Sequence, residues 1–70
     1  MFYNTQETGK RIAKIRWEME MTQSEFAELL NITDRHLRRI EAGEKGASIE
    51  VLAAITVHSG KSLDFIVLGK

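Results

Sequence analysis

The sequence predicts an all-α domain of five helices, and three observations support this prediction. Apolar residues recur every three or four positions in several segments, which is the spacing of one helix face. No segment sustains the apolar–polar alternation of a β-strand, and the chain contains no proline. A serine or threonine precedes the apolar segments as a candidate N-cap, and a glycine or asparagine follows most of them as a candidate stop.

The length of the chain allows one domain, residues 1–70, with residues 1–6 expected to be a flexible N-terminal segment because they show no periodicity. A domain of this size buries only about 60% of the surface that its unfolded chain exposes, so oligomerisation would help to stabilise it. No apolar run approaches the roughly 20 residues of a membrane span. We therefore expect a soluble, cytoplasmic protein.

The composition excludes several classes of function. The chain has no cysteine, so disulfides, thiolate metal ligands and a cysteine nucleophile are not available. Its two histidines, His36 and His58, are isolated and do not make a metal site. Paired carboxylates beside a histidine and a phosphate-binding glycine loop are also missing. We expect no enzyme activity, no metal, no cofactor and no small-molecule substrate.

A first helix is expected to begin after Thr8, its candidate cap. Ile12, Ile15 and Met19 then form an apolar stripe along one face. Trp17 lies on the flank of this stripe. We expect it in the core or at the core edge, and stacking on a nucleic-acid base is the alternative.

Residues 22–43 predict two short helices joined by a tight turn, and the rest of the chain is arranged around this segment. Thr22 caps the first of these helices, and Glu25 three residues later completes a capping box. Asn31 tolerates a left-handed backbone, so the chain can reverse there. Thr33 is the candidate cap of the second helix, and a glycine ends that helix.

The second of these helices has an apolar side and a basic side. At about 100° per residue, Leu37 and Ile40 point one way and Arg35, Arg38 and Arg39 point the opposite way. Arginine carries a rigid donor fork that matches guanine O6 and N7 or a phosphate. An outward trio of arginines on a helix that follows a tight turn is typical of a helix that enters the DNA major groove. A solvated basic face is the alternative.

Two further helices are expected after a polar loop that contains Lys45, a candidate phosphate contact. Ser48 is the cap of the fourth helix, whose expected apolar face is Ile49, Leu52, Ala53, Ile55 and Thr56. Ser62 is the cap of the fifth helix, whose apolar residues are Leu63, Phe65, Ile66, Val67 and Leu68. A helix that is apolar on more than one side must bury its second side. We therefore expect these five residues to form a homodimer interface.

The charge distribution bears on nucleic-acid binding. Ten basic and ten acidic residues give a net charge of zero, which argues against a nucleic-acid partner. Most of the basic residues nevertheless lie in two clusters, Lys10, Arg11, Lys14 and Arg16 in the first and Arg35, Arg38 and Arg39 in the second. The positive potential is expected to be local, with a weak sequence-independent affinity.

A larger set of residues gives a family resemblance, which runs from about Ile12 to Leu68. Its motif positions are Thr22-Gln23, Ala27, Leu30-Asn31-Ile32-Thr33, Leu37, Arg39-Ile40-Glu41, Gly43, Ser48 and Leu63-Asp64. Together they resemble the phage-repressor-like, Cro-type helix-turn-helix family, also called the xenobiotic-response-element family. The resemblance implies a compact five-helix, lambda-repressor-like DNA-binding domain with the helix-turn-helix at the second and third helices.

The resemblance also implies roles for individual residues. Phosphate contacts are implied for Gln23 and Thr33, and an ion pair is implied between Glu41 and Arg16. Base contacts, or contacts to flanking phosphates, are implied for Asp34, Arg35, Arg38 and Arg39. Asp34 is unusual there because its carboxylate repels phosphate. It could accept from a cytosine amino group, cap the helix or orient Arg38.

Two functions are compatible with these expectations. The first is a sequence-specific regulator of transcription, a repressor that binds double-stranded DNA at an inverted-repeat operator as a homodimer. The alternative is a protein-interaction module of antitoxin-like or adapter type, which uses the apolar last helix and binds DNA only secondarily. Net neutrality and the apolar last helix favour the alternative.

Overall fold

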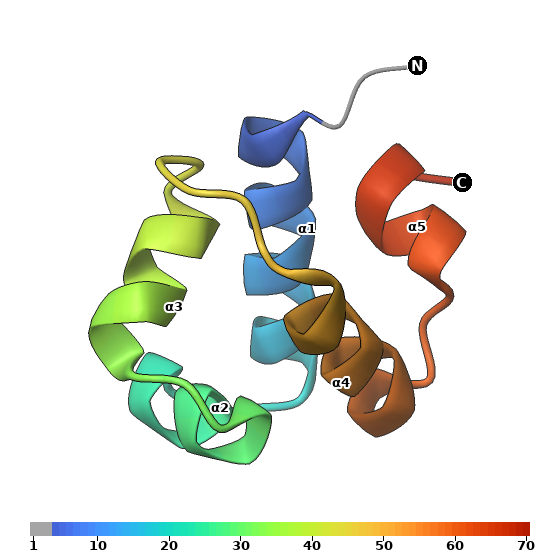
Figure 1. The fold of residues 1–70 in the computed structure, drawn as a ribbon. Coiled ribbons are helices and arrows are strands. Elements are labelled where there is room, and N and C mark those ends of the chain that lie inside the picture. The colour runs from blue at the N-terminus through green and yellow to red at the C-terminus, as the bar shows by residue number, and fades with distance from the viewer. Residues whose placement is uncertain (1–3) are drawn as a thin grey trace.

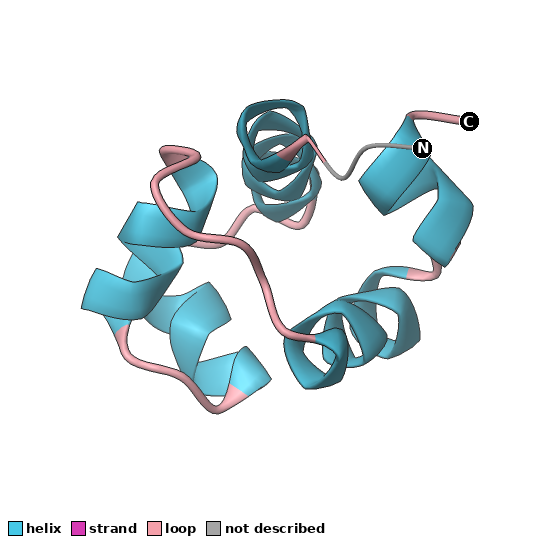
Figure 2. Cartoon of the chain, turned by 45° about the horizontal axis from the view of Figure 1, so that its top comes forward, coloured by secondary structure: helices cyan, strands magenta, loops and turns pink. Residues whose placement is uncertain are grey.

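Five helices joined by short loops make up the computed structural model, which describes residues 4–70 and has no strand among them (Figures 1 and 2). The helices are α1 (Thr5–Glu18), α2 (Gln23–Leu30), α3 (Asp34–Glu41), α4 (Ile49–Ser59) and α5 (Leu63–Leu68). The predicted all-α class is confirmed. None of these helices combines the length and the apolar character needed to cross a membrane.

α1 is the central helix, with α3 on one side of it and α5 on the other (Figure 1). α2 packs against α3, and α4 closes the domain against α2 and α5. The buried hydrophobic side chains of these helices, together with Ala47 of the loop before α4, form one core. They are Ile12, Ile15, Phe26, Ala27, Leu30, Leu37, Ile40, Ala47, Val51, Leu52, Ile55 and Ile66. Every helix therefore contributes to the same apolar interior.

α1 begins earlier than the sequence predicts. Asn4 is its N-cap, because the Asn4 side chain accepts a hydrogen bond of 2.9 Å from the N–H of Glu7. Thr8, the expected cap, is buried in the second turn and its hydroxyl donates to the Val67 carbonyl at 3.5 Å. The first turn of α1 has no apolar stripe from which to recognise it. Of the expected flexible segment, residues 1–3 lie outside the described residues and Thr5 already belongs to the helix.

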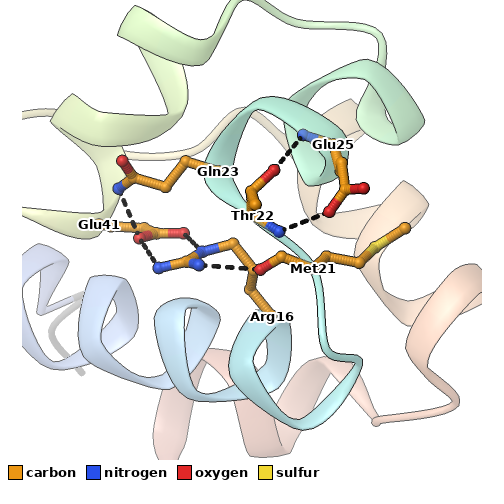
Figure 3. A network of polar contacts seen from close by, with 6 residues as sticks. All are labelled: Arg16, Met21, Thr22, Gln23, Glu25 and Glu41. Carbon is orange, nitrogen blue, oxygen red and sulfur yellow. Dashed lines mark hydrogen bonds and ion pairs between the residues drawn. The ribbon is translucent and has the colours of Figure 1, made fainter.

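The caps of α2 and α3 and the tight turn between these helices have the predicted form. Thr22 and Glu25 make both hydrogen bonds of a capping box, at 3.1 and 2.9 Å (Figure 3). Asn31 adopts the left-handed conformation with φ of 62°, which reverses the chain after α2. Thr33 then caps α3 by accepting from the N–H of His36 at 3.0 Å.

Trp17 and the apolar face of α4 do not lie where the sequence predicts. Trp17 is 69% exposed, so its expected place in the core or at the core edge is wrong. Ile49 and Ala53 are also exposed, and α4 buries Val51 instead, together with the expected Leu52 and Ile55. α4 is apolar on more than one side, so periodicity could not select the side that faces the core.

α5 buries much of its apolar surface within its own chain. Ile66 is completely buried in the core, and Phe65 and Val67 pack against that core. Arg11 of α1 holds the end of the helix by donating to the Ile66 and Val67 carbonyls at 2.8 and 2.9 Å. Ile66 therefore has no surface to offer a partner, and its expected place in a dimer interface is wrong.

Gly9 allows α1 and α3 to approach closely. A Cβ at this position would overlap the carbonyl oxygen of Ile40 and would lie 2.8 Å from that of Glu41, both at the end of α3. These are backbone atoms, so they cannot move aside without shifting the helix. A glycine that usually weakens a helix interior is here required by packing.

Replacing Gly9 with alanine is expected to lower the free energy of unfolding by about 1–3 kcal/mol, although alanine favours a helix, because the added methyl overpacks the contact. Urea denaturation followed by circular dichroism measures the change. Lys10→Ala, at the exposed neighbouring position, is the control and should stay within about 0.5 kcal/mol of the parent. A Gly9→Ala protein as stable as the parent would contradict the close approach.

Candidate nucleic-acid interface

α3 presents its arginines to solvent because its other side is anchored in the core. Leu37 and Ile40 are almost completely buried, and they fix the rotation of the helix about its axis. Arg35, Arg38 and Arg39 are exposed as a result. The outward orientation that the helical spacing predicts is therefore present.

The charged contacts on this face are weak and exposed. Arg38 Nη1 lies 3.4 Å from Asp34 Oδ2, and Arg39 Nε lies 3.8 Å from Glu44 Oε1. Arg35 has no ion pair with any residue that the structure describes. Exposed ion pairs of this kind are worth about 0–1 kcal/mol, so a ligand can replace them at little cost.

The arginines of α3 share a hollow with the start of α2. This open depression of about 650 Å³ is lined by Arg35, Arg38 and Arg39, by Gln23 and by Ala13 of α1. Glu41 and Glu44 contribute its acidic atoms. The hollow brings together three of the four base-contact candidates on α3 and the phosphate-contact candidate Gln23, which comes from a separate part of the sequence. Asp34, the fourth, does not line it.

A buried polar network lies beneath this surface (Figure 3). Arg16 donates to both carboxylate oxygens of Glu41, at 2.8 and 3.1 Å, and to the Met21 carbonyl at 3.0 Å. The side chains of Arg16 and Glu41 are only 8% and 7% exposed. Gln23 adds a hydrogen bond of 3.0 Å from its amide nitrogen to Glu41. The network ties the end of α3 to the end of α1 and the start of α2.

The network changes what Gln23 can offer to a ligand. One amide N–H of its side chain is already used by Glu41, which leaves the second N–H and the side-chain carbonyl. Its backbone N–H belongs to the first turn of α2, where N–H groups have no intrahelical acceptor. A phosphate contact by Gln23 would use these remaining donors.

The other candidates lie around the hollow rather than in it. Thr33 is exposed, and its hydroxyl oxygen already accepts the capping hydrogen bond. Lys45 is exposed in the loop after α3, beside Glu44, and does not line the hollow. His36 is partly buried, whereas His58 is exposed near the end of α4. Within residues 4–70 no cluster of side chains could hold a metal ion.

Near this surface, sequence reasoning missed Ala13 and gave a nucleic-acid contact by Trp17 only as the alternative to a core position. Ala13 lines the hollow from α1, and Trp17 lies one helical turn further along the same helix. The spacing carries a signal for both, because Ala13 and Trp17 are four residues apart on a face that the apolar stripe of α1 does not use. Trp17 was nevertheless expected in the core or at the core edge, because its indole ring is large.

A helix-turn-helix held against a common core, with arginines on the outer side of its second helix, defines a DNA-binding protein of the helix-turn-helix class. The family model described as "Helix-turn-helix" matches residues 7–66. The chain therefore belongs to the Cro/C1-type, xenobiotic-response-element-like helix-turn-helix family of DNA-binding transcription regulators.

One solved structure supports the fold. The crystal structure of the clp gene regulator ClgR from C. glutamicum superposes with a TM-score of 0.81 and covers 97% of this chain and 88% of its own, at 24% sequence identity. No curated protein sequence matches the chain. A similar fold thus occurs in a gene regulator with a distant sequence.

Replacing Glu41 with alanine is expected to lower the free energy of unfolding by about 3–5 kcal/mol, because Arg16 would remain buried without a counter-charge. Urea denaturation measures the loss. Glu18→Ala is the control, since it removes a carboxylate that lies 3.9 Å from Lys61 in a half-exposed pair, and it should cost no more than about 1 kcal/mol. Equal losses in the two variants would refute the central role of the network.

Proposed function

We propose that this protein is a sequence-specific repressor that binds an inverted-repeat operator as a homodimer, with α3 in the major groove of each half-site. The observation that carries the proposal is the arrangement of α3, whose arginines face solvent because Leu37 and Ile40 are buried on the opposite side. A helix anchored in this way can insert its outer side chains into a groove without disturbing the core.

The dimensions and chemistry of α3 support direct reading of bases. With its side chains an α-helix is about 10–12 Å across, which fits the roughly 12 Å width of the major groove, and the eight residues of α3 give about two turns that can lie in it. Arg35, Arg38 and Arg39 can each place a donor fork on guanine O6 and N7. Asp34 lies close enough to Arg38 to orient it, and its oxygens could also accept from a cytosine amino group.

The proposed phosphate contacts position α3 rather than read the sequence. Gln23, Thr33 and Lys45 are the candidates, from the start of α2, the start of α3 and the loop after α3. Contacts of this kind fix the register of a protein on the duplex and are indifferent to the base pair. Because the net charge is zero, affinity is expected to depend on these local contacts.

The homodimer follows from the symmetry of an inverted repeat, with half-sites about 34 Å apart. The interface that we propose is the remaining apolar surface of α5, namely Leu63, Phe65, Val67 and Leu68. Leu63 is 42% exposed, and the other three are partly exposed. Repression would result because the bound dimer occludes a promoter.

A second candidate function is a protein-interaction module of antitoxin-like or adapter type. It is favoured by the net charge of zero and by apolar side chains such as Ile49 and Val57, which are highly exposed on α4. Size-exclusion chromatography with and without palindromic DNA separates the two functions. A regulator elutes as a larger complex when the DNA is present.

Selection of bound sites from random double-stranded DNA tests the main proposal. We expect an enriched inverted repeat whose half-sites are one helical turn apart. Failure to bind any duplex at low ionic strength would refute the proposal. Enrichment of a single, non-repeated site would refute the homodimer and leave DNA reading intact.

Replacing Arg39 with alanine is expected to remove about 1–3 kcal/mol of discrimination at one base position, because one guanine fork is lost. Fluorescence anisotropy with operators that vary at each position measures this change. Lys70→Ala also removes one exposed positive charge, far from α3 in the sequence, and should leave base preference unaltered.

Gln23→Ala should weaken binding to all sequences alike, and a changed base preference would contradict the positioning role of Gln23.

Replacing Leu63 with aspartate is expected to shift the dimer toward monomer, because it places a charge in the proposed interface. Ile49→Asp is the matched control. Each residue is the first of its helix, follows a serine cap and is exposed, so aspartate suits the local helix dipole in both cases. Analytical ultracentrifugation should show monomers for the first variant alone. If Ile49→Asp dissociates the protein and Leu63→Asp does not, the interface lies on α4.

A further inference from the structure

Trp17, at the end of α1, is a large side chain held in place at the surface. It is the only tryptophan of the chain and is 69% exposed. The guanidinium carbon of Arg16 lies 5.1 Å from the centre of its ring. Arg16 is itself fixed by Glu41 and by the Met21 carbonyl. The exposed indole therefore contacts a side chain of the rigid network beneath α3. This contact limits the conformational freedom of Trp17 before any ligand binds.

The turn after α1 brings the start of α2 beside the indole. Glu20 has a left-handed backbone with φ of 58°, and its N–H donates to the Trp17 carbonyl at 3.0 Å. Met21 donates to the Arg16 carbonyl at 3.2 Å. The chain thus reverses within three residues, and Thr22 follows directly at the cap of α2.

Two hollows flank the indole and continue into the hollow beneath the arginines of α3. The first, of about 600 Å³, extends from Trp17 to Gln23. The second, of about 490 Å³, is lined by Trp17, Lys14 and Ala13. Gln23 and Ala13 also line the hollow of the three arginines. Trp17 therefore lies at the end of a surface that is continuous with the candidate DNA interface.

We propose that Trp17 contacts the sugar-phosphate backbone of the DNA beside the groove that α3 enters. The ring would pack on a deoxyribose, and the indole N–H, which is a donor only, would bind a phosphate oxygen. Lys14 supplies positive charge from the same side and has no ion pair with any described residue. This inference rests on the proposed DNA-binding function and adds a positioning residue to it.

The charges around Trp17 point to backbone packing rather than to a purely electrostatic contact. Lys10 and Lys14 line the second hollow, together with Glu18, which lies 3.9 Å from Lys61. Glu20 is exposed and lines the first hollow, where it would repel a phosphate. The indole N–H and ring face offer a neutral contact among these positive and negative charges.

Glu20→Gln should tighten binding to every DNA sequence, because it removes the negative charge that would repel a phosphate.

The sole tryptophan makes the contact directly observable. The anisotropy of a labelled operator measures binding, and the fluorescence emission of Trp17 is recorded at each point of the same titration. We expect the emission to change at the same midpoint and its quenching by acrylamide to fall, because DNA would cover the ring. Emission that stays constant while the operator binds overturns the inference and leaves the proposed function standing.

Substitutions test whether the contact contributes affinity. Trp17→Ala should weaken binding about tenfold for all sequences, as expected for the loss of one charge-assisted hydrogen bond. Trp17→Phe keeps an aromatic ring and loses the N–H, so its operator affinity should lie between that of the parent protein and that of Trp17→Ala. Lys14→Ala should reduce the dependence of log affinity on log salt by about one unit. Thermal unfolding should be nearly unchanged in all three variants, because these side chains are exposed.

Val57→Ala is the matched control, since it removes another exposed apolar side chain, from α4, and should leave operator affinity unchanged. A changed base preference in Trp17→Ala would overturn the backbone role. So would an emission change without any loss of affinity, since the ring would then lie near the DNA without contributing to binding. If the parent protein binds no duplex at all, the proposed function fails and this inference fails with it.

Discussion

The buried pairing of Arg16 with Glu41 is the interaction on which the surface proposed to bind DNA depends. Two charges removed from water stabilise a fold only when their geometry is good and their remaining donors are used. Here Arg16 donates two hydrogen bonds to the Glu41 carboxylate and a third to the Met21 carbonyl. Gln23 donates a further hydrogen bond to Glu41. Within residues 4–70 no buried side-chain polar atom lacks a partner. Three helix ends are thereby held in one arrangement.

This arrangement lets a protein of zero net charge present a basic surface. Leu37 and Ile40 fix the rotation of α3, and Gly9 lets α1 approach the end of that helix. The three arginines of α3 are exposed to solvent as a result. Their exposed ion pairs with Asp34 and Glu44 moderate the local charge and cost little to exchange for a ligand. Binding would accordingly depend on shape and register more than on bulk attraction.

The distribution of apolar surface differs from the sequence-based expectation. α5 was expected to need a partner for its second apolar side, yet Phe65 and Val67 pack against the core of their own chain and Ile66 lies within it. The larger exposed side chains lie elsewhere, with Trp17 at the end of α1 and Ile49 at the start of α4. A dimer interface on α5 must therefore rely on less apolar area than the sequence implied.

The sequence by itself determined the caps of α2 and α3, the reversal at Asn31 and the outward arginines, because each depends on backbone hydrogen bonds or spacing within a few residues. The Arg16–Glu41 pair was accessible through the family resemblance alone. Only the tertiary structure decided that α4 buries Val51, that Gln23 bonds to Glu41 and that Trp17 is exposed. These outcomes depend on distances between segments far apart in the chain, and a helix with two apolar sides carries no local signal to choose between them.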